Sequence, residues 1–125
     1  MTHQQLIRLI AILTNSGAAS LTIPTLGRTT TIGITYLDGE APEIMVAYGN
    51  NGNAFSITVE HWESVKGRFR DLPADTQWDA EQYTDTNWPE CIYRHPSPYV
   101  AAILYYVTQI ENFFAPMYQN QAIAE

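Results

Sequence analysis

The chain's single cysteine lies in the stretch WPECIYRHPSPYV, residues 88–100, and a histidine follows it four positions later. A cysteine acts as a nucleophile only as its thiolate, which a nearby histidine, a cation or a helix N-terminus stabilises. His95, Arg94 and a helix that begins after the prolines would supply these groups to Cys91. No nucleophile signature surrounds the thiol, and free cysteines are among the most buried residues. Catalysis by Cys91 and burial as a structural residue are therefore alternatives.

A second set of residues has types that suit zinc. The segment His61-Trp62-Glu63 has the H-x-E spacing of the zinc deaminases, but their second motif, P-C-x-x-C, needs two cysteines and this chain has one. A zinc site of His61, Cys91 and His95 is an alternative, although the paired short-range motifs typical of zinc are missing. The sequence therefore assigns no catalytic residue and no metal. It leaves His61, Glu63, Cys91 and His95 as the candidates if the chain is an enzyme.

Aromatic residues between positions 62 and 93 are candidates for a ligand pocket. They are Trp62, Trp78, Tyr83, Trp88 and Tyr93. With acidic side chains at its rim, such a cup would bind an apolar or cationic small molecule through stacking and cation–π contacts. The alternative is that the tryptophans hold an irregular segment against the protein, because aromatic residues build cores more often than sites. No motif implies a cofactor.

The charge is distributed unevenly along the chain. Residues 1–70 contain five acidic and five basic residues, so the net charge of −7 lies wholly within residues 71–125. Its densest part is the segment 71–90, whose acidic residues are Asp71, Asp75, Asp79, Glu81, Asp85 and Glu90. Such a surface repels nucleic acid, which is bound through Lys and Arg. It suits a basic protein partner or an inhibitor that mimics nucleic acid, unless the preceding Lys66, Arg68 and Arg70 pair with it.

The elements that would position these residues indicate an α+β fold. Helical spacing of Leu6, Leu9, Ile10 and Leu13 predicts an N-terminal helix over residues 3–14. Period-two alternation then predicts an antiparallel sheet of three to four strands, over residues 19–23, 29–37, 43–49 and 54–59. The second strand carries threonines and a glycine on one face, which we expect to meet water or a partner.

A short second helix follows the sheet in this prediction. Thr58 is its expected N-cap, and Trp62, Val65 and Phe69 form its inward stripe with His61 on the outer side. Residues 71–97 show no periodicity beyond a short helical turn near 79–83. We therefore expect a long irregular acidic segment within a single domain of residues 1–125.

A long C-terminal helix is the clearest element, and it packs on the sheet in this prediction. Ser97 and Pro98 suit its first positions, and Pro116 is expected to end or kink it. Its apolar surface is wider than one small sheet can cover, so we expect a homodimer that buries the surplus. The predicted interface residues are Val100, Ile103, Tyr106, Val107, Ile110 and Phe114.

These patterns favour a small non-enzymatic binding protein that acts as a homodimer. The alternatives are a small-molecule binder or enzyme using the aromatic cup, and an acidic inhibitor that mimics nucleic acid. No apolar run is long enough to span a membrane and the N-terminus lacks a basic leader, so we expect a cytoplasmic protein. That a mobile genetic element encodes it is a further hypothesis, which no residue pattern tests.

Overall fold

The computed structural model describes residues 1–27, 30–49, 52–84 and 97–124, and of residues 113–124 only the backbone. The elements occur in the predicted order of helix, four strands, helix, short turn and long helix. They are α1 (His3–Leu13), β1 (Leu21–Pro24), β2 (Thr31–Leu37), β3 (Glu43–Tyr48), β4 (Asn53–Ser56), α2 (Val59–Asp71), η1 (Ala80–Tyr83) and α3 (Ser97–Ala124). Period-two alternation and turn residues therefore located the strands, and helical spacing with capping residues located the α-helices.

The strands form one antiparallel meander in the order β1-β2-β3-β4. Ile34 lies between Leu21 of β1 and Val46 of β3, while Ile32 pairs with Ile23, so branched apolar side chains meet on one face. Ile23, Ile32, Ile34, Ile44 and Val46 are almost completely buried. Because side chains alternate along a strand, Thr22, Gly33 and Ala47 lie on the opposite face.

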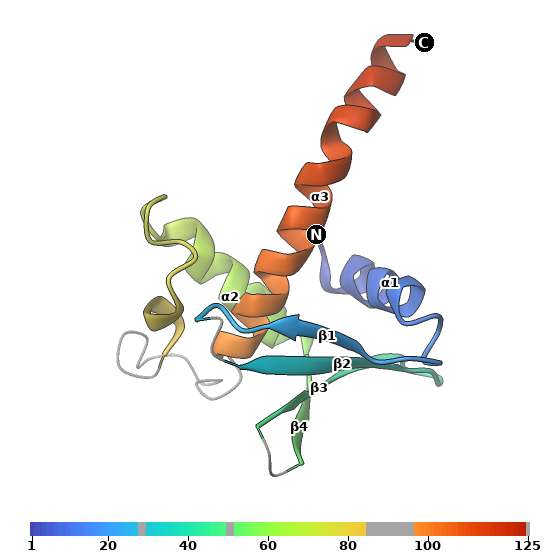
Figure 1. Cartoon of the computed structure of the whole chain (residues 1–125), viewed down its shortest axis with the longest axis vertical. Coiled ribbons are helices and arrows are strands. Elements are labelled where there is room, and N and C mark those ends of the chain that lie inside the picture. The colour runs from blue at the N-terminus through green and yellow to red at the C-terminus, as the bar shows by residue number, and fades with distance from the viewer. Residues whose placement is uncertain (28–29, 50–51, 85–96, 125) are drawn as a thin grey trace.

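All three α-helices lie on the same side of the sheet (Figure 1). Their buried side chains join those of the strands in one hydrophobic core, which includes Leu6 and Ile10 of α1, Trp62 and Val65 of α2, and Ile103 of α3. The α+β class and the packing of the C-terminal helix on the sheet are confirmed. The strands follow one another without intervening helices, so one face of an antiparallel sheet is left for all the helices to cover.

The turn after α1 holds that helix close to β2. Asn15, Ser16 and Gly17 have φ values of 53°, 56° and 93°, a left-handed run that favours Asn and Gly. A Cβ atom at Gly17 would lie 2.9 Å from the carbonyl oxygen of Tyr36. Glycine at position 17 therefore permits both the backbone turn and the close approach to the second strand.

Both short helices begin with a reciprocal capping box. In α1, Thr2 Oγ1 accepts from the Gln5 N–H, and Thr2 N–H donates to Gln5 Oε1. In α2, Thr58 is the cap as predicted, and its side chain accepts from the backbone N–H of His61. The predicted position of His61 on the outer side of α2 is wrong, because the residue is only 8% exposed. Its ring turns back to the cap, where histidine takes the role of Gln5 in α1.

The last helix differs from its prediction at one end. It begins at Ser97, with Pro98 in its first turn, as expected. Pro116 was one expected end point of this helix, and that prediction is wrong, because α3 continues to Ala124. Proline removes one backbone hydrogen bond, to the carbonyl of residue 112, and the turns on either side are retained. The C-terminal part of α3 extends well beyond the rest of the protein (Figure 1). Across the described ranges, no helix has the length and apolar character required to cross a bilayer.

Candidate functional site

The first candidate catalytic residues, His61 and Glu63, lie on different sides of α2. His61 Nδ1 accepts a hydrogen bond from Thr58 N–H at 3.3 Å, and Phe55 meets the imidazole ring edge-on at 6.0 Å. Burial lowers the pKa of His61, although a backbone contact with Ser56 and the nearby Glu60 partly oppose this shift. Burial therefore favours the neutral form of the imidazole, one nitrogen of which is engaged in capping the helix.

Glu63 is part of a separate, exposed interaction. Its carboxylate accepts from Lys66 Nζ at 3.2 Å, and the same ammonium group donates to the carbonyl oxygen of Met1 at 2.9 Å. Residues two positions apart on a helix do not face each other, so His61 and Glu63 are not placed to share one reacting group. Their arrangement caps α2 and ties it to the N-terminus.

The other catalytic and zinc candidates lie outside the described residues. Cys91 and His95 fall between residues 85 and 96, so their predicted roles stay predictions. Among the residues that the structure does describe, no group of three His, Cys, Asp or Glu side chains is arranged to hold a metal ion. The alternative zinc site would need Cys91 and His95 in addition to His61, and it stays a prediction.

The predicted aromatic cup is divided between the core and the surface. Trp62 is fully buried and its indole N–H donates to the carbonyl oxygen of Met1 at 2.9 Å. Tyr83 is also fully buried, its hydroxyl donates to Gln77 O at 2.6 Å, and burial raises its pKa to about 12. Both side chains contribute to the hydrophobic core. Trp88 and Tyr93 lie outside the described residues.

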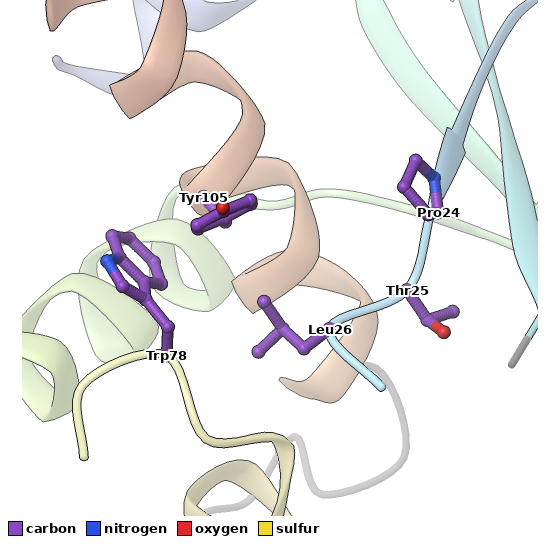
Figure 2. Close-up of a pocket in the computed structure, with 5 residues that line it drawn as sticks. All are labelled: Pro24, Thr25, Leu26, Trp78 and Tyr105. Carbon is purple, nitrogen blue, oxygen red and sulfur yellow. The ribbon is translucent and has the colours of Figure 1, made fainter. Parts of the chain in front are cut away.

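Trp78, the remaining member of the predicted cup, lines a surface pocket of about 290 Å³. Three separate segments supply its walls: the residues at and after the end of β1, the turn that carries Trp78, and α3 (Figure 2). The lining residues are Pro24, Thr25, Leu26, Trp78 and Tyr105. Trp78 packs on Phe69 with ring centroids 4.4 Å apart, and it meets Tyr105 at 5.0 Å and 75°. Two aromatic rings therefore form a corner opposite Leu26.

Hydrogen bonds fix both walls of this pocket. Thr25 donates from its N–H and from its hydroxyl to Thr30 O, at 3.0 and 3.2 Å, which holds the chain on either side of the β1–β2 connection. On the other side, Gln77 Nε2 donates to Phe69 O at 3.0 Å, beside Trp78. Sequence reasoning missed Leu26 and Tyr105 as pocket residues. They lie about eighty positions apart, and no local pattern links them.

The predicted dimer residues on α3 divide into three groups. Val100, Ile103 and Val107 are at most 1% exposed and belong to the chain's own core. Tyr106 and Ile110 are half-buried, and the side chain of Phe114 lies outside the described part. The body of the protein therefore uses the first half of the predicted seam, and the same spacing continues onto the part of α3 that extends beyond it (Figure 1).

The acidic residues within and just before η1 face solvent. Asp71, Asp75, Asp79 and Glu81 are all exposed. Of the bases that precede this stretch, Lys66 contacts Glu63, and Arg68 donates to the carbonyl and side-chain oxygens of Gln82. This stretch therefore presents several carboxylates on one short segment.

No family model, curated protein or solved structure matches this chain. The function is therefore inferred from the geometry of its own residues. That geometry offers a pocket at Trp78, an exposed acidic stretch, and a helix that continues beyond the core.

Proposed function

We propose that this chain is a small non-enzymatic interaction protein that works as a homodimer through the C-terminal half of α3. The observation that carries the proposal is the extension of α3 beyond the sheet and the other helices (Figure 1). A single helix gains most of its stability from packing, so an extended end is best explained by a partner that covers it.

The spacing of apolar residues supports a helical partner. Val100, Ile103 and Val107 are spaced by three and four residues and lie in the core, and Ile110, Phe114 and Met117 continue this spacing. Such a 3-4 repeat is the seam of two helices that pack side by side. The continuation of a core-facing seam past the core favours pairing with the same segment of a second copy.

Charge also favours self-association at this part of the molecule. Residues 112–124 contain no charged side chain, whereas the whole chain carries a net charge of −7. Two copies that meet along this segment keep the exposed acidic residues of the 71–81 stretch outside the contact. A twofold arrangement gives each copy the same contact, as in most small oligomers.

The exposed acidic stretch suits a second, basic protein partner. Asp71, Asp75, Asp79 and Glu81 lie within eleven residues, and a cluster of one sign raises the rate of encounter with a surface of the opposite sign. In a homodimer this surface would be present twice. This gives the proposed module a repeated acidic contact for a basic protein.

The oligomeric state of designed variants tests the proposal. We expect native mass spectrometry and light scattering to give twice the 14.1 kDa chain mass for the natural sequence. Phe114→Glu places a charge in the proposed seam and should give folded monomers, whose helix signal by circular dichroism decreases by no more than the extended end of α3 contributes. Ile110→Glu, about one turn closer to the core, should act in the same direction.

Ile12→Glu provides the matched control. Ile12 is 76% exposed on α1, so the same charge there should leave the dimer intact. A natural sequence that is monomeric at about 100 μM contradicts the proposal, because specific dimers of functional use are tighter than this. A folded Phe114→Glu dimer of unchanged affinity contradicts it as well.

A further inference from the structure

We propose that the pocket between Leu26, Trp78 and Tyr105 is a binding site for a neutral, flat aromatic molecule of about two fused rings. The site is independent of the proposed dimer, whose seam lies on the extended part of α3. Figure 2 shows the three side chains converging from the β1–β2 connection, the turn before η1 and α3.

The shape of the pocket favours a flat ring. Trp78 and Tyr105 stand at 75° to each other with centroids 5.0 Å apart, so a ligand that stacks on one ring meets the other at its edge. Stacked and edge-to-face contacts are the two favourable geometries for aromatic pairs. Leu26 closes the opposite side, and the volume of about 290 Å³ lies at the lower end of the range for small-molecule sites.

The lining also favours a neutral ligand. None of the five described residues that line the pocket is charged, and an ionised group removed from water without a partner is strongly disfavoured. The hydroxyl of Tyr105 makes no hydrogen bond to any residue within the described ranges. It is therefore available to a single hydroxyl or carbonyl group on the ligand.

The pocket is formed before any ligand enters. The bonds from Thr25 to Thr30 O fix the segment that carries Leu26, and Trp78 is held by its packing on Phe69. A preformed site spends little conformational entropy on binding. Trp78 lines an open pocket, whereas the side chains of Trp62 and Tyr83 are enclosed by the core and hydrogen-bonded to backbone carbonyls.

Three probes of one shape and different charge test the site. They are 2-naphthol, which is neutral at pH 7, 2-naphthoate, which is anionic, and 2-naphthylmethylammonium, which is cationic. Binding is followed by the indole N–H signals in two-dimensional ¹H–¹⁵N spectra, assigned with Trp78→Phe. We expect 2-naphthol to shift the Trp78 signal with a dissociation constant of about 0.1–1 mM. The Trp62 signal, bonded to Met1 O, serves as the internal reference and should not move.

Two substitutions connect the binding to this pocket. Leu26→Trp fills the cavity and should weaken 2-naphthol binding at least about tenfold, whereas Ile12→Trp adds the same side chain on exposed α1 and should not. Tyr105→Phe keeps the ring and removes the hydroxyl, and should weaken binding about 2- to 10-fold. The charged probes should bind at least about tenfold more weakly than 2-naphthol.

Three results would each overturn the assignment. They are no shift of the Trp78 signal at the solubility limit of 2-naphthol, equal affinity for all three probes, and unchanged affinity in a folded Leu26→Trp variant. None of these measurements depends on the oligomeric state of the protein. The experiments can therefore contradict the proposed binding site without contradicting the proposed dimer, and the reverse.

Discussion

The two halves of α3 have the same apolar spacing but different surroundings. In the first half, Val100, Ile103 and Val107 are at most 1% exposed and contact the sheet and the other helices. In the second half, the helix extends beyond the rest of the protein (Figure 1). Periodicity reports that a helix has an apolar stripe, and it does not report whether the chain's own core or another molecule covers that stripe.

The difference between the halves changes where a dimer contact is sought. The sequence alone predicts one interface from Val100 to Phe114, but the first part of this stretch is already packed inside the monomer. A substitution there tests the fold, and a substitution in the second half tests association. The following predictions separate these two effects, beginning with the largest.

A matched pair of substitutions on α3 should give the largest contrast. Ile103→Ala removes a fully buried side chain and should lower the free energy of unfolding by about 2–5 kcal/mol. Ile110→Ala removes the same atoms from a half-buried position and should cost less than half as much. Urea denaturation measures both, in protein dilute enough that association does not contribute.

The natural sequence at several concentrations is the control for this pair. If its unfolding midpoint does not change in the dilute range, the comparison reports the monomer alone. Equal losses for Ile103→Ala and Ile110→Ala would show that the core extends to Ile110. The boundary between the two halves of α3 would then lie closer to the C-terminus than the exposed fractions indicate.

The sequence predicted the fold well because its signals are local. Alternating side chains marked each strand, the Gly and Asn residues of the turns separated them, and Thr58 marked the start of α2. Even the short turn at Ala80–Tyr83 was located within residues 79–83. Each of these signals depends on neighbours within a few positions, so one sequence is sufficient to read them.

The candidate site was harder to predict because it depends on distant residues. Trp62 and Tyr83 were grouped with Trp78 by residue type, yet they lie in the core. Leu26 and Tyr105, which line the pocket with Trp78, come from segments that only the folded chain brings together. Helical spacing predicts His61 on the outer side of α2, because this pattern contains no information about a side chain that turns back to the cap of its own helix.

The pH dependence of stability should come from the body of the protein and not from the extended half of α3. The pKa of folded His61 lies below its ordinary value, so the unfolded chain binds more protons below about pH 6.5. Stability is therefore full above this pH and should decrease as the pH falls. Protonated Nδ1 can no longer accept from Thr58 N–H, which removes half of the α2 capping box. Thermal unfolding between pH 7.5 and 5.5 measures the effect.

His61→Gln is the variant that tests this cause. Glutamine stands at the same position in the capping box of α1, where Gln5 accepts from Thr2 N–H, and it does not titrate. The variant should lose less stability than the natural sequence over this pH range. His3→Gln is the control for the histidine that contacts Ile57 O. The same pH-dependent loss in His61→Gln and in the natural sequence would assign the effect to other groups.

The smallest effect is expected where α3 leaves the core, at Thr108. Its hydroxyl donates to Leu104 O at 2.7 Å within the same helix, and its side chain is half-buried. Thr108→Ala removes this bond but leaves the helical backbone bond to the same carbonyl, and alanine favours the helix. We expect the free energy of unfolding to change by no more than about 0.5 kcal/mol. A loss above about 1 kcal/mol would mean that Thr108 packs as a core residue, and the surface available to a second copy would begin further along the helix.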